Sequence, residues 1–83
     1  MHELRLLPSA QRDLDDLDKP LLRRLFDKIL ALKADPRPVG AVKLTADDGY
    51  RLRVGDYRVL YRVEDRARVV YIYRVKHRKE VYR

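Results

Sequence analysis

The sequence contains no cysteine and only two histidines, and these shortages exclude several kinds of site. Without cysteine the chain has no disulfide, no thiolate metal ligand and no thiol nucleophile. His2 and His77 are too few and too far apart to indicate a metal site, so we expect neither a metal nor another cofactor. Ser9 is the only serine, and the three glycines suit separate turns. A serine-based triad and a glycine-rich nucleotide loop are therefore not indicated.

Long apolar segments are also absent. The longest uninterrupted apolar run covers residues 69–73, far short of a membrane span or of the apolar part of a signal peptide. We therefore expect no membrane contact and a cytoplasmic location. A chain of 83 residues suffices for one small hydrophobic core, and we expect residues 1–83 to form a single domain.

Positive charge is in excess, and all of the excess lies in the second part of the chain. The net charge is +7. Residues 1–35 carry seven basic and seven acidic side chains, whereas residues 36–83 carry thirteen basic and six acidic ones. A basic field confined to one part of the chain favours a nucleic acid or an acidic partner, although a basic surface that serves only solubility is an alternative.

The first part of the chain predicts one strand and two amphipathic helices. We expect a strand at residues 3–7, then a helix with Ser9 as its N-cap and Asp13 near its positive end. A second helix begins after Asp18 and ends before the prolines of residues 35–38. The apolar face of the first helix is formed by Ala10, Leu14 and Leu17, and that of the second by Leu21, Leu22, Leu25, Phe26, Ile29 and Leu30. We expect both faces to be buried against a sheet.

Residues 50–62 predict a β-hairpin, because β-branched and aromatic residues alternate with charged ones on both sides of a turn that contains glycine. Side chains alternate between the two faces of a strand, so Arg51 and Arg53 share a face of the first strand. Arg58 and Arg62 share a face of the second. If the two faces coincide, the hairpin carries a row of guanidinium groups that suits a polyanion.

The remaining segments complete an α+β domain. We interpret residues 39–49 as a connection, residues 64–67 as a turn and residues 69–75 as a strand that lies inside the sheet. The order β-α-α-β-β-β, followed by a short C-terminal segment, predicts a helical hairpin packed on one face of a mainly antiparallel sheet, with the other face open. We expect the tyrosines of this sheet to pack it rather than to stack on bases.

The order of these motifs resembles the RelE/ParE toxin superfamily, and more closely the RelE-type toxins of type II toxin–antitoxin systems. The resemblance covers nearly the whole chain. It is carried by Lys43-Leu44, Tyr50-Arg51-Leu52-Arg53, Gly55-Asp56-Tyr57-Arg58-Val59-Leu60-Tyr61 and the ending His77-Arg78-Lys79-Glu80-Val81-Tyr82.

The resemblance implies an endoribonuclease (an mRNA interferase) that depends on the ribosome and not on a metal. Such an enzyme cuts messenger RNA in the ribosomal A site and so inhibits translation. The 2′-hydroxyl of the RNA attacks the adjacent phosphorus and leaves a 2′,3′-cyclic phosphate and a 5′-hydroxyl. The resemblance also implies a RelB-like antitoxin on a separate chain, which forms a hetero-oligomer with the toxin.

The resemblance also implies roles for individual residues. Arg58 matches the arginine that holds the scissile phosphate, and several guanidinium groups together would stabilise the charge of the phosphorane. The expected catalytic residues are Arg51, Arg53, Arg58, His77, Arg78 and Tyr82. The expected RNA-binding residues are Lys43, Arg51, Arg53, Arg58, Arg62, Lys76 and Lys79.

Two departures from the family pattern bear on the chemistry. Some relatives carry lysine at the positions of Arg51 and Arg53, and arginine essentially never accepts a proton in a protein. The task of general base therefore falls to Tyr82, whose phenolate form neighbouring cations would favour, or to His77. Many relatives also carry glycine where this chain has Lys76, a change that either adds an RNA contact or redirects the next residues.

Two other functions compete with RNA cleavage. A ParE-like protein would share the fold but inhibit DNA gyrase by binding, without nuclease activity. A non-catalytic module that binds RNA or the ribosome is the other alternative. Retention of Arg58, Arg78 and Tyr82 favours the nuclease, since a protein that only binds gyrase does not need this set.

Overall fold

The computed structural model describes residues 1–45 and 48–81, which form three helices and five strands. In chain order these elements are β1 (Glu3–Leu6), α1 (Pro8–Asp15), α2 (Lys19–Ala31), β2 (Ala41–Lys43), β3 (Tyr50–Val54), β4 (Tyr57–Glu64), β5 (Val69–His77) and α3 (Arg78–Val81). In this described part of the chain, no helix is both long enough and apolar enough to cross a membrane.

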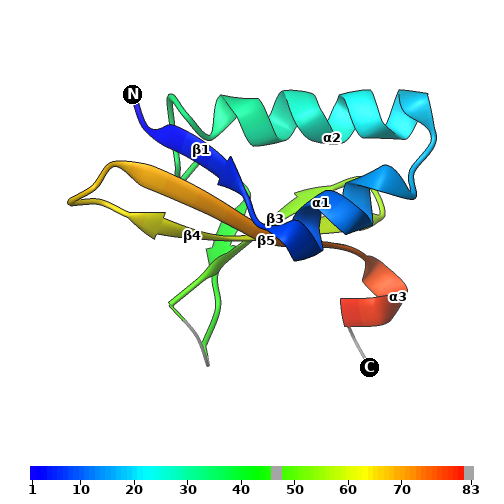
Figure 1. Cartoon of the computed structure of the whole chain (residues 1–83). Helices are drawn as coiled ribbons and strands as arrows, with labels where there is room; N and C mark the ends of the chain where they lie inside the picture. Colours follow the sequence, from blue (N-terminus) through cyan, green and yellow to red (C-terminus); the bar gives the residue numbers. More distant parts are fainter. Residues whose placement is uncertain (46–47, 82–83) are drawn as a thin grey trace.

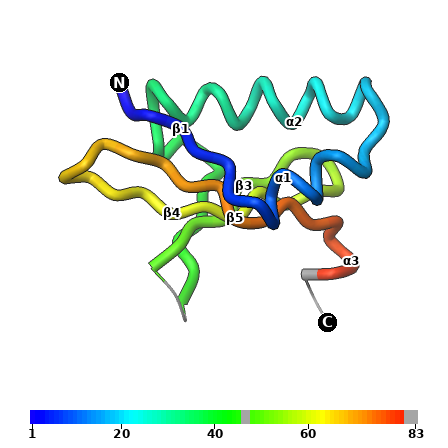
Figure 2. The backbone as a smooth tube through the Cα atoms, in the orientation of Figure 1, coloured from blue at the N-terminus to red at the C-terminus, as the bar shows by residue number. Residues whose placement is uncertain are grey.

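The strands form one sheet in the order β1-β5-β4-β3-β2. β1 runs parallel to β5, and the other neighbouring strands are antiparallel. Figures 1 and 2 show α2 along one side of the sheet and α3 projecting from the other side. The predicted α+β class is confirmed, and so is the mainly antiparallel sheet. The three-residue strand β2 was not predicted, because it lies within the segment interpreted as a connection.

The core lies between the sheet and the first two helices. Both helices begin with a proline in their first turn, a position where the missing N–H costs no hydrogen bond. The core joins side chains of alternating strand positions to the inner faces of α1 and α2. Its buried residues are Ala10, Leu14, Leu25, Ile29, Leu32, Leu52, Val54, Val59, Tyr61, Val70, Ile72 and Val75.

A two-residue turn joins β3 to β4 and fixes the register of the hairpin. Gly55 has φ +60°, the left-handed conformation that glycine adopts at the lowest cost, whereas Asp56 is not left-handed. This combination fits a type II′ turn, which matches the twist of antiparallel strands. As a consequence Leu52 faces Val59 on the core side, and the residues on either side of them face away from the core.

α1 takes the place of a strand at the free edge of β5. β1 pairs with β5 only as far as Ile72, and α1 then runs beside the second half of β5. The Ser9 hydroxyl donates to the carbonyl of Tyr73 at 2.5 Å, and the backbone N–H of Val75 donates to Asp13 Oδ2 at 2.8 Å. Side chains of α1 thus bind the backbone groups that β1 leaves unpaired.

This contact corrects two local predictions. Ser9 is not the N-cap of α1, because the N-cap position is Leu7 and no side chain caps the helix there. Asp13 does not serve the helix dipole, because its carboxylate binds Val75 and also the guanidinium of Arg74, at 2.9 and 3.3 Å. α2 begins directly after Asp18, as predicted, with Asp18 at the N-cap position, but the Asp18 side chain makes no capping hydrogen bond.

We expect Asp13→Ala to lower the free energy of unfolding by about 2 kcal/mol, because a buried strand N–H and a guanidinium both lose a charged acceptor. Asp13→Asn, which keeps one oxygen, should cost less. Asp15→Ala removes an exposed carboxylate of the same helix and should change stability by less than about 0.5 kcal/mol. Urea unfolding of the three variants tests this, and equal losses for both alanine variants would contradict it.

An aromatic cluster closes the core at the end of the sheet near the residue 64–67 turn. The rings of Tyr50 and Tyr61 stack with centroids 5.6 Å apart, and the guanidinium of Arg37 lies 5.3 Å from the Tyr50 centroid. Arg37 also donates to both carboxylate oxygens of Asp65, at 3.1 and 2.8 Å, which lowers the pKa of Asp65. The Tyr61 hydroxyl donates to the carbonyl of Pro36 at 2.8 Å. The chain after α2 is thereby fixed to β3 and β4.

Candidate functional site

The open face of the sheet carries basic side chains on three adjacent strands. Arg53 of β3 is the register partner of Arg58 in β4, and Arg58 is the partner of Lys76 in β5. Partners on neighbouring strands project to the same side, about 5 Å apart, so these three side chains emerge together. Arg51 lies two residues before Arg53 and projects from the same face. We call Arg51, Arg53, Arg58 and Lys76 the basic row. The predicted coincidence of the two arginine faces of the hairpin is therefore confirmed.

Arg58 is the most enclosed member of the basic row, with 6% of its surface exposed. Its Nη1 donates to the carbonyl of Tyr57 at 3.3 Å. Within residues 1–45 and 48–81, no carboxylate forms an ion pair with any member of the row. Burial of a charge without a counter-charge is unfavourable, and like charges on facing strand positions repel. An anion from outside the chain would remove both penalties.

The first residue of α3 is joined to the turn of the hairpin. The backbone N–H of Arg78 donates to the carbonyl of Asp56 at 2.7 Å, and Arg78 Nε lies 4.0 Å from Asp56 Oδ1. Since Asp56 belongs to the β3–β4 turn, this contact holds α3 at the end of the sheet that carries the basic row (Figure 1). The sequence indicated Asp56 only as a turn residue, because the contact depends on the strand pairing.

His77 lies on the opposite face from the basic row. It is the register partner of Tyr57, one position beyond Lys76, and its ring meets the Tyr57 ring edge-on at 5.2 Å. Its Nδ1 accepts a hydrogen bond from the backbone N–H of Lys79 at 3.2 Å. The structure therefore does not bring the imidazole together with the guanidinium of Arg58.

The other predicted residues are distributed over both faces. Arg62 projects from the same face as Arg58, and its guanidinium lies 5.1 Å from the ring centroid of Tyr73. Lys43 pairs with Tyr50, whose ring stacks on the buried ring of Tyr61, so it projects from the core side. Lys79 is exposed on α3. The prediction for Tyr82 lies outside the described residues.

The guanidinium and ammonium groups of the basic row determine what the open face of the sheet can bind. Guanidinium and ammonium groups form short charge-assisted hydrogen bonds with phosphate oxygens, and arginine can do so through two parallel bonds. In the described part of the chain, no three histidine, aspartate or glutamate side chains are arranged to hold a metal ion. The face is thus a candidate site for a phosphate-bearing ligand.

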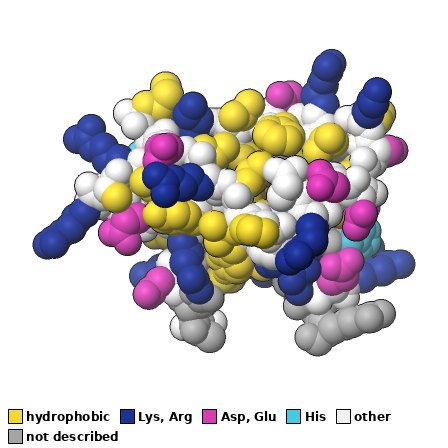
Figure 3. Space-filling view, viewed as in Figure 1, with side chains coloured by type: hydrophobic (Ala, Val, Ile, Leu, Met, Phe, Trp, Pro, Cys, Tyr) yellow, Lys and Arg dark blue, Asp and Glu magenta, His cyan; other side chains and the backbone are white. Residues whose placement is uncertain are grey.

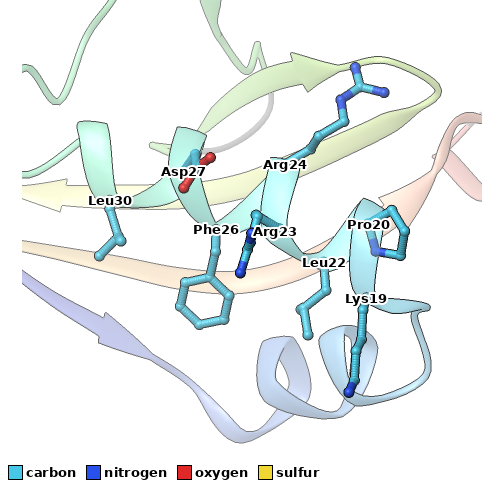
Figure 4. A pocket seen from close by; sticks show the side chains of 8 residues that line it. All are labelled: Lys19, Pro20, Leu22, Arg23, Arg24, Phe26, Asp27 and Leu30. Atoms are coloured by element: carbon cyan, nitrogen blue, oxygen red, sulfur yellow. The ribbon is translucent and has the colours of Figure 1, made fainter.

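A second exposed surface lies on the outer side of α2. Leu22, Phe26 and Leu30 follow at four-residue intervals and line a groove of about 970 Å³ (Figure 4). Leu30 is 47% exposed, and Figure 3 shows apolar side chains between separate basic ones along this edge. The groove is also lined by Lys19, Pro20, Arg23, Arg24 and Asp27. The prediction that the whole apolar arc of α2 is buried is therefore wrong, because the arc is wider than the face that contacts the sheet.

Comparison with known proteins matches this fold and its sequence to one group. The family model described as the ParE toxin of the type II toxin–antitoxin system parDE matches residues 4–82. Toxin RelG from Mycobacterium tuberculosis is 32% identical, over 99% of this chain and 97% of the relative.

Solved structures agree. The RelBE2 toxin–antitoxin complex from Mycobacterium tuberculosis has a TM-score of 0.82 at 29% identity, covering 92% of this chain and 96% of the matched chain. The archaeal RelE–RelB complex from Pyrococcus horikoshii has a TM-score of 0.79 at 30% identity, covering 93% and 94%. The isolated RelE toxin from Escherichia coli has a TM-score of 0.81 at 26% identity, covering 99% and 92%. The chain therefore belongs to the RelE/ParE superfamily of type II toxin–antitoxin toxins, and among these it is similar to the RelE-type toxins.

Proposed function

We propose that this toxin is an endoribonuclease that cuts messenger RNA in the ribosomal A site without a metal ion. The observation that carries the proposal is the basic row, in which a nearly buried arginine stands between two other cations and has no carboxylate partner in the described residues. A phosphodiester supplies the missing counter-charge. Its charge rises from one to two at the phosphorane, so a fixed guanidinium binds the transition state more strongly than the substrate.

The proposed reaction is an internal transfer within the RNA. The 2′-oxygen forms a bond with the adjacent phosphorus as its proton leaves to a base, and the bond from phosphorus to the 5′-oxygen breaks. The products are a 2′,3′-cyclic phosphate and a 5′-hydroxyl, whose oxygen takes up a proton. Arg58 holds the non-bridging oxygens, and Arg78, held at the same end of the sheet, stabilises the leaving oxygen. Of the two bases that the sequence left open, Tyr82 and His77, we propose Tyr82, because His77 lies on the opposite face from Arg58.

Mapping of RNA ends on programmed ribosomes tests the function directly. The protein should produce new 5′ ends within the A-site codon, each carrying a hydroxyl. The same ends should appear when the toxin alone has been treated with EDTA, and the EDTA removed, before it is added to the ribosomes. Naked RNA of the same sequence should stay intact. Intact messenger RNA on ribosomes, combined with growth arrest when the protein is expressed, would overturn the nuclease proposal.

We infer that the partner of this toxin is a RelB-like antitoxin whose amphipathic helix covers the groove on α2. Several of the matched structures are complexes of RelE-type toxins with RelB-type antitoxins, among them the complexes from Mycobacterium tuberculosis and Pyrococcus horikoshii. The groove offers three apolar side chains in a row, and its basic residues outnumber its single carboxylate. A helix with an apolar stripe flanked by acidic residues would complement both features.

We expect Leu30→Glu to weaken antitoxin binding about 10-fold or more, because it removes an exposed apolar contact and adds a charge that repels an acidic helix. RNA cleavage by the free toxin should stay unchanged. Lys28→Gln is the matched control, since it alters the net charge equally on the same helix but outside the groove. Calorimetric titration with the antitoxin measures both, and equal affinities for the two variants would contradict the inferred surface.

Gyrase inhibition is the second candidate function. The family model that matches the chain is described as a ParE toxin, which keeps this candidate in consideration. A supercoiling assay separates the two functions, because a gyrase inhibitor should block supercoiling at toxin concentrations that leave ribosome-bound messenger RNA intact.

A further inference from the structure

The open face of the sheet contains a second concave site, beyond the basic row along β4 and β5. It is a cavity of about 590 Å³, and its lining includes Arg62, Glu64, Tyr71 and Tyr73. Arg62 lies four residues after Arg58 on the same face of β4, a separation of about 13 Å along a strand. A single-stranded RNA bound at the basic row therefore reaches this cavity within a few nucleotides.

The tyrosines of this cavity differ from the aromatic residues of the core. Tyr71 and Tyr73 are partly exposed on the open face, whereas Tyr61 is fully buried on the other. Tyr71 lies between Arg62 on β4 and Arg5 on β1, its register partners on the two sides. A ring that is fixed in a sheet between two arginine positions is a suitable platform for stacking a base.

The Tyr73 side chain lies against Arg62 and extends to Gly49. The guanidinium of Arg62 lies 5.1 Å from its ring centroid. Its hydroxyl reaches Gly49, where a Cβ atom would lie only 2.9 Å from the oxygen. Glycine at this position thus leaves room for the Tyr73 side chain to extend across β4. The side of the cavity that Tyr73 forms is therefore already in place in the free protein.

The cavity is lined by two carboxylates, those of Asp48 and Glu64, and these groups determine which part of a nucleotide fits it. An exposed carboxylate repels a phosphate but accepts hydrogen bonds from the amino and imino groups of cytosine, adenine or guanine. The basic row, by contrast, has no carboxylate partner in the described residues and attracts phosphate. The two parts of the face are complementary to the two parts of a nucleotide.

We propose that this cavity binds one unpaired nucleobase of the RNA, stacked on Tyr71 and hydrogen-bonded to Glu64. The proposal rests on RNA being the ligand of the basic row, as in the proposed function. It assigns sequence preference to a site outside the basic row. The expectation that the tyrosines of the sheet only pack it is replaced, for Tyr71, by a binding role.

The test measures binding without cleavage. A fluorescent RNA of about eight nucleotides with 2′-O-methyl groups cannot undergo the internal transfer, so its anisotropy reports affinity alone. We expect Tyr71→Ala to weaken binding about 10-fold and Tyr71→Phe to leave it unchanged, since the phenyl ring keeps the stacking surface. Glu64→Gln should alter the ranking of RNAs that differ in one base more than it alters the mean affinity.

An abasic nucleotide, moved along the RNA, locates the base that occupies the cavity. At one position the loss of the base should weaken RNA binding by the wild-type protein about 10-fold. The same loss should not weaken RNA binding by Tyr71→Ala any further. Equal affinities of wild-type protein and Tyr71→Ala would overturn the proposal, and so would a Tyr71→Ala effect on antitoxin affinity with none on RNA. Circular-dichroism melting verifies that the variants are folded.

The outcomes also separate this inference from the nuclease proposal. RNA that binds in a Tyr71-dependent way but is never cut on ribosomes supports the cavity and overturns the enzyme. Cleavage on ribosomes by Tyr71→Ala at the wild-type rate and with the wild-type choice of codons, together with unchanged binding, overturns the cavity and leaves the enzyme intact.

Discussion

Arg58→Ala should reduce the rate of RNA cleavage on programmed ribosomes by about 100- to 1000-fold. This is the effect of removing one fixed donor from a transition state that gains charge. Arg58 is nearly buried at the centre of the basic row, so no water can replace the guanidinium at full strength. Single-turnover cleavage with excess toxin measures the chemical step, because saturation removes the contribution of ribosome binding.

Two further variants make this result specific. Arg58→Lys keeps the positive charge but not the pair of parallel donors, and we expect an intermediate rate. Arg66→Ala removes an exposed arginine from the β4–β5 turn and should leave the rate unchanged. Arg58→Ala should fold at least as stably as the wild type, because a buried cation beside two others is lost. A rate for Arg58→Ala within a factor of three of the wild type would remove Arg58 from the mechanism.

Tyr61→Ala should lower the free energy of unfolding by about 4 kcal/mol, the largest stability effect that we predict for a single substitution. The Tyr61 ring is fully buried and stacks on Tyr50, and its hydroxyl donates to the carbonyl of Pro36. Truncation leaves a cavity, an unpaired carbonyl and a loosened segment after α2. Urea unfolding at neutral pH provides the measurement.

Tyr61→Phe removes the hydroxyl but keeps the ring, so it tests a pH dependence of stability that comes from the Tyr61 phenol. Burial raises the pKa of Tyr61 from 10.0 to about 12. Between these values the unfolded chain has lost the phenol proton and the folded chain keeps it. The contribution to stability is therefore complete below pH 10 and falls by about 3 kcal/mol as the pH rises to 12. The fall should be absent in Tyr61→Phe, and parallel curves for the two proteins would contradict this assignment.

The sequence predicted the hairpin and its arginine face because these features depend on local rules. Side chains alternate along a strand, and a two-residue turn with glycine fixes which residues are opposite each other, so Arg53 and Arg58 could be expected on one face. The buried side of α2 could also be predicted, since Leu25 and Ile29 follow the helical period.

Features that depend on contacts between distant parts of the chain could not be predicted. Lys76 joins the basic row only because β5 lies next to β4, and the row would be different with another strand order. Ser9 and Asp13 fit the local rules for helix starts, yet their partners lie 64 and 62 residues away on β5. Ser9 and Asp13 form hydrogen bonds with the edge of β5 rather than with the start of their own helix, because the backbone groups at this edge are otherwise unpaired.

The position of β5 between β1 and β4 also determines when the toxin can form during its synthesis. β1 leaves the ribosome long before β5, which is its neighbour in the sheet among the described residues. Pairing of Glu3 with Val69 closes a loop of more than sixty residues, whose entropy must be lost before any contact is gained. A nascent or prematurely terminated chain therefore has neither its core nor its basic row assembled, and both are completed only after β5 has been synthesised.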